Sequence, residues 1–220
     1  DYVLQKQGPE DEKKVAKAVN ILVAALTKLR AAANRAGYRL LLWGDYAITP
    51  AISVVHPNRL LREAGLFITR EVNGRLYPDL YRSRAFAMVD HQIAHVYVNH
   101  TADTNAVREC LATAPGIAEI HSREECIDHP NSGELILTAA PGAWFAYPWW
   151  HEAAQAPDYA GHVDIHNKPG YDPAELFFGW PPGTVSMKPE RIGGTHGRND
   201  GPARAGIWCS TCLENKAGTL

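Results

Sequence analysis

The sequence lacks three features that would each identify a class of protein. No apolar run approaches the roughly 18 residues that a membrane-spanning helix needs. Four cysteines in 220 residues are too few for a disulfide scaffold. A net charge of -2, with Lys and Arg spread along the chain, gives no basic stripe. The sequence therefore predicts a globular domain with no membrane segment and no dedicated nucleic-acid surface. It does not indicate an oligomeric state.

The first half of the chain combines a helical pattern with a short apolar run. Apolar residues at helical spacing predict a long helix over residues 10–36, which Gly37 ends. The run Leu40–Leu42 predicts a buried strand over residues 38–43, with Asp45 just past its end. A long helix followed by a wholly apolar strand is typical of parallel sheets in α/β domains. We therefore expect an α/β fold with a mostly parallel central sheet flanked by helices.

Shorter elements are expected further along. Residues 1–9 are predicted to form a loop, and Asn73-Gly74 a turn. Residues 135–138 and 144–147 are predicted to form a hairpin. The stretch 149–198, rich in Pro, Gly and aromatics, is expected to be irregular. The remaining expected elements are helices over 57–64 and 104–112 and strands over 67–71, 95–99, 117–120 and 207–209.

Carboxylates and imidazoles gather in a few separated clusters, and such groups are the ligands of divalent metal sites. Each cluster also has a plainer interpretation. Asp45 could cap a helix, Asp90-His91 could form a surface turn, and the alternating polar residues near His166 could share one strand face. Composition and spacing alone leave both interpretations open. The clusters are Asp1 with Gln5, Asp45 with Tyr46, Asp90 with His91, His162 with Asp164 and His166, and His196.

The order of these clusters resembles the type I phosphodiesterase/nucleotide pyrophosphatase branch of the alkaline phosphatase superfamily. Residues 1–9 look like its Asp-x-x-x-His motif with a following Gly-Pro, although Gln5 stands at the histidine. Residues 43–48 look like its strand end with Asp-His, although Tyr46 stands at the histidine. Residues 194–197 look like its Gly-x-His-Gly segment. Residues 83–98 and 164–173 are similar to one subgroup of the family.

The resemblance implies a partial alkaline phosphatase-like core carrying a small α+β cap. The predicted divisions are a core segment over 1–56, a cap and irregular region over 57–191, and a return to the core over 192–220. The chain opens without Met, and we expect it to be the C-terminal part of the domain. The nucleophile of the family is then expected upstream of Asp1.

The resemblance also implies a site. Asp1 and His196 would bind one metal ion and Asp45 a neighbouring one, with Gln5 and Tyr46 as possible further ligands. Asp90, His91, Asp164 and His166 would contact the substrate or support the ligands. The family implies Zn, whereas replacing two imidazoles by the oxygens of Gln5 and Tyr46 favours Mg, Mn or Ca.

Three functions remain open from the sequence. The first is a metal-dependent phosphoryl hydrolase that acts on a small phosphorylated substrate. The second is a catalytically impaired binding relative of the same fold, suggested by Gln5 and Tyr46. The third is a biosynthetic phosphoryl- or sulfuryl-transfer enzyme, for which the aromatic stretch 144–150 could line a substrate pocket; core packing is the plainer interpretation of that stretch.

Overall fold

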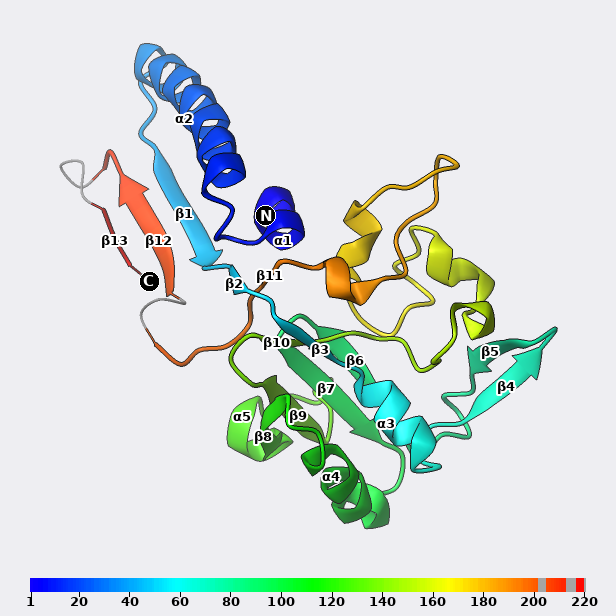
Figure 1. The fold of residues 1–220 in the computed structure, drawn as a ribbon. Coiled ribbons are helices and arrows are strands. Elements are labelled where there is room, and N and C mark those ends of the chain that lie inside the picture. The colour runs from blue at the N-terminus through cyan, green and yellow to red at the C-terminus, as the bar shows by residue number, and fades with distance from the viewer. Residues whose placement is uncertain (202–204, 213–216, 220) are drawn as a thin grey trace.

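The most deeply buried part of the structure surrounds a four-stranded antiparallel sheet of order β6-β7-β9-β8 (Figure 1). A computed structural model describes residues 1–201, 205–212 and 217–219 of the chain. The helices α3 and α4 contact each other and the sheet. Because Leu61, Val96, Leu111 and Leu137 are fully buried between these elements, they form the centre of the core. The elements are β6 (Ala85–Asp90), β7 (Ile93–Val98), β8 (Ile117–Ser122), β9 (Leu135–Ala139), α3 (Pro57–Glu63) and α4 (Thr104–Ala112).

Three smaller strand pairs adjoin this body. The hairpin of β4 (Thr69–Val72) and β5 (Arg75–Pro78) turns at Asn73-Gly74, both with positive φ, as predicted. The strands β3 (Ser53–Val55) and β10 (Ala143–Phe145) pair in parallel. The strands β2 (Thr49–Pro50) and β11 (Gly194–Thr195) pair antiparallel, and so bring the end of the first quarter of the chain to residues near its C-terminal end.

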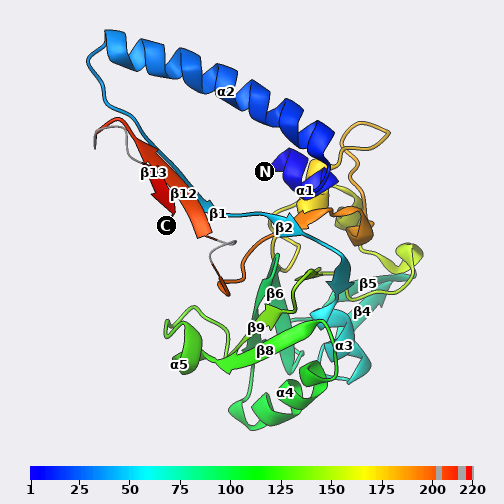
Figure 2. The same ribbon diagram turned by 60° about the vertical axis from the view of Figure 1, so that its left-hand side comes forward.

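A separate part of the molecule, which we call the wing, consists of one long helix above a three-stranded antiparallel sheet (Figures 1 and 2). The helix is α2 (Glu12–Arg35), and the sheet has the order β1-β12-β13. Apolar side chains of the wing are widely exposed, among them Ile21 at 64% and Trp43 at 68%. The wing strands are β1 (Leu41–Tyr46), β12 (Ala205–Ser210) and β13 (Ala217–Thr219).

The stretch after β10 is irregular, as the composition predicts. It contains short 3-10 turns and then β11. The aromatic residues from Trp144, in β10, to Trp150 are buried in the core, so packing is the correct interpretation of them. The turns are η2 (Ala153–Gln155), η3 (Asp158–Gly161), η4 (Pro173–Leu176) and η5 (Pro189–Arg191); elsewhere, η1 (Thr101–Asp103) and α5 (Arg123–Cys126) complete the set.

Several predicted helices and strands are confirmed to within two residues at each end. The helix expected over 10–36 is α2, and those expected over 57–64 and 104–112 are α3 and α4. The strands expected over 67–71, 95–99, 117–120 and 207–209 are β4, β7, β8 and β12. No described helix combines the length and the apolar character that crossing a bilayer requires.

Other expectations are wrong. Residues 1–9 contain a helix, α1 (Tyr2–Gln7), instead of a loop. The strand β1 is antiparallel to β12 and only half-buried, because an apolar run does not reveal whether a neighbour covers it. Residues 135–138 and 144–147 form no hairpin: β9 joins the four-stranded sheet, whereas β10 pairs with β3.

Parallel pairing is rarer than predicted. In the part of the chain that the structure describes, β3 with β10 is the parallel strand pair and the other strand pairs are antiparallel. A mixed α/β architecture with several small sheets is therefore what these residues form. The segment predicted over 192–220 includes residues 202–204, 213–216 and 220, which lie outside the described residues.

Candidate functional site

The N-terminal helix brings Asp1 and Gln5 to the segment that carries His196. The backbone N–H of Gly193 donates to the Gln5 carbonyl at 2.7 Å. A side chain at Gly194 would lie 2.3 Å from the Leu4 carbonyl oxygen, so glycine is required for this close approach. The Gln5 side chain is buried, and its Oε1 has no hydrogen-bond partner in the described structure. Helix α1 therefore fixes two predicted site residues against β11.

The end of β1 brings Tyr46 onto His196. Because β2 follows β1 and pairs with β11, residues 150 positions apart in sequence become neighbours. The rings of Tyr46 and His196 stack at 3.7 Å between centroids, with 9° between their planes. The Tyr46 hydroxyl donates to Asp1 Oδ2 at 3.4 Å. Asp1, Tyr46 and His196, predicted from three separate motifs, thus lie together.

The turn between β6 and β7 adds Asp90 and His91 to the same place. His91 has φ 51°, in the left-handed region that a non-glycine residue seldom adopts. Its ring lies 4.0 Å from the His196 ring, and its Nδ1 lies 3.3 Å from Thr195 Oγ1. The Gln92 N–H donates to the His196 carbonyl at 2.9 Å. A strained residue that tertiary contacts hold in place is a common feature of functional sites.

Burial and nearby carboxylates set the protonation of the site. Burial lowers the pKa of His196, against the opposing effect of Asp90 and Asp45. Burial also lowers the pKa of His91 to about 3, with a further contribution from His196. Burial raises the pKa of Asp90, whereas His196 and His95 lower it. Asp45 acts on His196 through its charge, although its own side chain is exposed. His91 is therefore a neutral imidazole at neutral pH.

Tyr171 joins the site although it was not predicted. Its ring lies 5.3 Å from the His91 ring, and it comes from the irregular stretch. Burial, followed by Asp90, raises the pKa of Tyr171, and a hydrogen bond from the Gln5 side chain lowers it. Burial also raises the pKa of Tyr46, and Asp45, Tyr171 and Asp90 add to this effect. Spacing gave no sign of Tyr171, because no regular element carries it.

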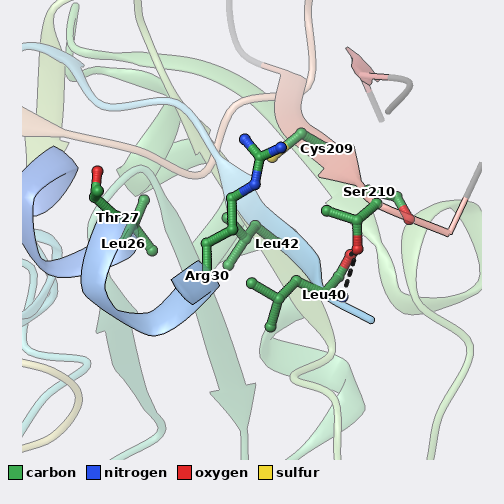
Figure 3. A pocket seen from close by; sticks show the side chains of 8 residues that line it. Leu26, Thr27, Arg30, Leu40, Leu42, Cys209 and Ser210 are labelled. Atoms are coloured by element: carbon green, nitrogen blue, oxygen red, sulfur yellow. Dashed lines mark hydrogen bonds between the residues drawn. The ribbon is translucent and has the colours of Figure 1, made fainter. Parts of the chain in front are cut away.

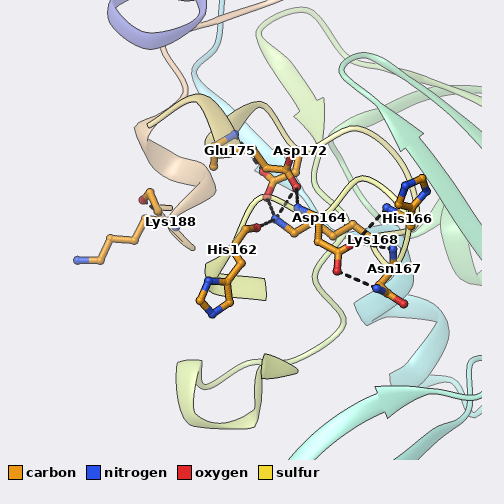
Figure 4. A network of polar contacts seen from close by, with 10 residues as sticks. His162, Asp164, His166, Asn167, Lys168, Asp172, Glu175 and Lys188 are labelled. Atoms are coloured by element: carbon orange, nitrogen blue, oxygen red, sulfur yellow. Dashed lines mark hydrogen bonds and ion pairs between the residues drawn. The ribbon is translucent and has the colours of Figure 1, made fainter. Parts of the chain in front are cut away.

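Asp164 and His166 lie in a different network (Figure 4). Asp164 Oδ1 accepts from the backbone N–H groups of His166 and Asn167, both at 3.0 Å. Asp164 Oδ2 accepts from Asn167 Nδ2 at 2.7 Å. These bonds lower the pKa of Asp164. This geometry stabilises a turn, and the role predicted for Asp164 and His166 at the site remains a prediction.

The hollows elsewhere contain none of the predicted ligands. One of about 300 Å³ lies between α2 and the wing sheet, lined by Leu26, Arg30, Leu42 and Cys209 among others (Figure 3). A cavity of about 10 Å³ lies beneath the aromatic stretch, beside Trp144 and Tyr171. This cavity is at most the size of one water molecule. This cavity beneath the aromatic stretch is therefore too small for an organic substrate.

The side chains at the site match a hard cation by their chemistry. Asp1, Asp45 and Asp90 supply carboxylates, and Gln5 supplies a buried amide oxygen without a partner. Oxygen ligands of this kind suit Mg, Mn or Ca better than Zn. Within residues 1–201, 205–212 and 217–219, no group of three or more His, Cys, Asp or Glu is arranged to hold a metal ion. The coordination geometry is therefore not laid out among these side chains.

A comparison with protein-family models supports the family resemblance over the residues that hold the first two motifs. The sequence model of type I phosphodiesterase/nucleotide pyrophosphatase matches residues 1–172. Among solved structures, murine ectonucleotide pyrophosphatase/phosphodiesterase 5 is similar, with 11% sequence identity and a TM-score of 0.46 over 87% of this chain and 42% of that one. This chain thus spans less than half the length of that protein. A search of curated proteins finds no match.

Proposed function

Because the chain belongs to the type I phosphodiesterase/nucleotide pyrophosphatase family, we propose that the whole protein hydrolyses a phosphoryl ester of a small substrate. The active site then includes Asp1, Asp45, Tyr46 and His196. One observation carries the proposal: Tyr46 stacks on His196 and donates to Asp1, so that residues from three motifs of the family order are neighbours. The nucleophilic hydroxyl comes from outside this chain in the proposal.

A divalent ion is part of the proposal, with Asp1, Asp45 and His196 as ligands and Gln5 Oε1 as an additional oxygen. The charge of the site supports it. Asp45 and Asp90 act on the charge of His196, and Asp1 is hydrogen-bonded to Tyr46, which stacks on His196; these carboxylates would repel a phosphoryl group that approached without a cation. A bound divalent ion supplies positive charge that offsets the charge on the phosphoryl oxygens. The oxygen-rich side chains favour Mg or Mn over Zn.

The chain's own residues orient the groups of the site in this proposal. The Tyr46 hydroxyl orients the Asp1 carboxylate through their hydrogen bond. The Tyr46 ring and the buried His91 ring hold the His196 imidazole between them. Since burial keeps His91 neutral, it acts by packing and hydrogen bonding and not as a charge. Orientation of this kind supports catalysis because it lowers the cost of arranging the reacting groups.

The proposal extends to the fold. In an alkaline phosphatase-like core, the strands of residues 1–56 would continue into a larger sheet with strands from outside this chain. Residues 1–56 and 192–220 would belong to that core and residues 57–191 to a cap. The exposed apolar side chains of the wing support a larger core, because apolar surface of this extent is rarely left open to water.

The test is turnover of bis-para-nitrophenyl phosphate by the full-length protein, with EDTA and then with added Mg, Mn or Zn. We expect hydrolysis that EDTA abolishes and Mn or Mg restores. Asp45→Ala should reduce kcat at least a hundredfold, since it removes a proposed ligand. The matched control is Asp128→Ala, an exposed carboxylate in another loop. Equal activity of the two variants would contradict the role of Asp45.

A binding relative without turnover is the second candidate, and one observation favours it. The Tyr46 ring covers one face of His196. At the position of Tyr46, the motif of the family has a histidine that would bind a metal ion. The double variant Gln5→His/Tyr46→His separates the candidates. If the wild type is inactive and the double variant gains zinc-dependent turnover, the chain is a relative that has lost catalysis. If the wild type is active, the second candidate is excluded.

A further inference from the structure

A segment of the irregular stretch crosses from the body to the site, and we call residues 164–175 the strap. It is bonded to the end of β6. The Tyr171 N–H donates to the Val89 carbonyl at 2.8 Å, and the Val89 N–H donates to the Pro169 carbonyl at 3.2 Å. Val89 and Gly170 form a parallel bridge. Because Asp90 and His91 directly follow Val89, the strap ends beside the site.

A buried ion network holds the strap (Figure 4). The Lys168 side chain is only 1% exposed, and its Nζ lies 3.0 Å from Asp172 Oδ2 and 2.8 Å from Glu175 Oε1. The same Nζ donates to the His162 carbonyl at 2.9 Å. The Tyr147 ring lies 5.6 Å from Lys168 Nζ. A buried cation with two carboxylates and a carbonyl is fully partnered, so the strap has a defined conformation.

Gly170 sets how closely the strap approaches β6. Its φ is +113°, and a Cβ there would lie 2.0 Å from the Val89 carbonyl oxygen. Any other residue would therefore push the strap away from the sheet. The tight approach places the next residue, Tyr171, with its ring against His91. The ion network and the glycine together determine the position of one aromatic side chain.

Tyr171 contributes a neutral hydrogen-bond donor, a group that is scarce in the rest of the site. The ionised carboxylates of Asp1, Asp45 and Asp90 can only accept hydrogen bonds. The oxygens of a phosphoryl group are acceptors too, so these carboxylates cannot hydrogen-bond to it. A phenol can donate to such an oxygen. The Tyr46 hydroxyl already donates to Asp1. The Gln5 side chain lowers the pKa of Tyr171, as a donor towards the phenol oxygen does, so the Tyr171 proton is available to donate. Tyr171 is also 40% exposed, so a ligand can reach it.

We propose that Tyr171 contacts the phosphoryl group bound at this site through its hydroxyl, and that Lys168 is the positioning residue that holds it there through the strap. The proposal rests on the proposed function and adds a specificity-determining donor to it. In this proposal the strap places a neutral hydrogen-bond donor among the carboxylates of the site. Lys168 acts through Tyr171: its ion network fixes the backbone of the strap, and this backbone sets the position of the Tyr171 phenol.

The first experiment compares full-length wild type, Tyr171→Phe and the control Tyr81→Phe, whose side chain is 94% exposed in a loop of the body. Turnover of bis-para-nitrophenyl phosphate and thermal unfolding are measured. Tyr171→Phe keeps the ring against His91 and removes only the hydroxyl. We expect kcat/KM to fall about fivefold to tenfold, the effect of one neutral hydrogen bond, with Tm nearly unchanged. Tyr81→Phe should match wild type in both.

The second experiment tests the positioning role. Lys168→Met leaves two buried carboxylates without a cation, so it is paired with the triple variant Lys168→Met/Asp172→Asn/Glu175→Gln, which removes the uncompensated charge. In the folded variant, kcat/KM should fall at least as far as in Tyr171→Phe. Adding Tyr171→Phe to it should then cause little further loss, since the phenol is already displaced. A full additional loss would overturn the positioning role.

The two proposals fail in different ways. If wild type turns over and Tyr171→Phe equals it in kcat/KM, the donor role is overturned and the proposed function stands. If wild type does not turn over, the proposed function fails, and binding of inorganic phosphate with Mn is measured by calorimetry. Weaker binding by Tyr171→Phe than by wild type would support the donor role. Equal binding, or none by wild type, would overturn it.

Discussion

The body and the wing contain similar apolar patterns and bury them to very different extents. In the body, Leu61, Leu111 and Leu137 are fully enclosed between α3, α4 and the four-stranded sheet. In the wing, α2 has an equally apolar stripe, yet Leu22 is 55% exposed and Ile21 64%. Periodicity shows where the apolar face of a helix lies. It does not show whether another part of the structure covers that face.

The largest expected effect tests this difference directly. Leu137→Ala in the body should reduce the free energy of unfolding by about 2–5 kcal/mol, because it leaves a cavity among fully buried side chains. Leu22→Ala in the wing should change it by less than about 0.5 kcal/mol. Urea denaturation of both variants, followed by circular dichroism, measures the difference. A loss from Leu22→Ala as large as from Leu137→Ala would show that a further segment or a second copy covers α2.

The same difference explains how much of the fold the sequence predicts. The helices α2, α3 and α4 have clear periodicity or a proline start, and all three are confirmed. Asn73-Gly74 predicts its hairpin because its turn chemistry is local. Helix α1 is not predicted, since it has six residues and depends on contacts with β11. Strand β10 looks like the second half of a hairpin, and its partner β3 lies 90 residues away.

Part of the site could be predicted from the sequence. The family resemblance points to Asp1, Asp45 and His196, with Gln5 and Tyr46 as possible further ligands. The structure stacks Tyr46 on His196 and places its hydroxyl 3.4 Å from Asp1. The sequence cannot show that Tyr46 stacks on His196, because the pairing of β2 with β11 brings them into contact. It places Tyr171 in a stretch similar to one subgroup of the family but assigns this residue no role. Residues that enter a site on an irregular segment have no periodicity, so only tertiary structure reveals them.

A smaller effect on stability is expected from replacing two glycines, one packed tightly against β6 and one in an open loop. Gly170→Ala should destabilise the protein by more than about 2 kcal/mol, because positive φ and the contact with Val89 act together. Gly183→Ala is the matched control, since Gly183 also has positive φ but nothing lies within 4 Å of the added Cβ. It should cost only about 1 kcal/mol. Equal losses in thermal unfolding would mean that the strap can move away from β6 without cost.

Acid should destabilise the body through His56. Burial lowers the pKa of His56 to about 3, from an ordinary value of 6.5, with help from Arg59 and His151. A group with a lowered pKa in the folded state stabilises the fold above its unfolded pKa. That stability is lost as pH falls from about 6.5 towards 3, by at most about 1.4 kcal/mol per pH unit. His56→Asn should flatten the pH dependence of urea unfolding between pH 6 and pH 4, relative to wild type. An unchanged slope would show that His56 is not buried as neutral imidazole.

The smallest expected effect is local to the wing. Asp11 caps α2, because its carboxylate accepts from the Lys14 N–H at 3.1 Å. Asp11→Ala removes the cap, whereas Asp11→Asn keeps an acceptor at the same place. Since α2 has few contacts with the rest of the described structure, the loss should appear as faster amide exchange in its first turn, with the body unchanged. Hydrogen exchange read by mass spectrometry can resolve the two regions. If Asp11→Ala also speeds exchange in β6, β7 and β9, the wing and the body unfold as one unit, and the exposed face of α2 contributes more to the fold than its contacts indicate.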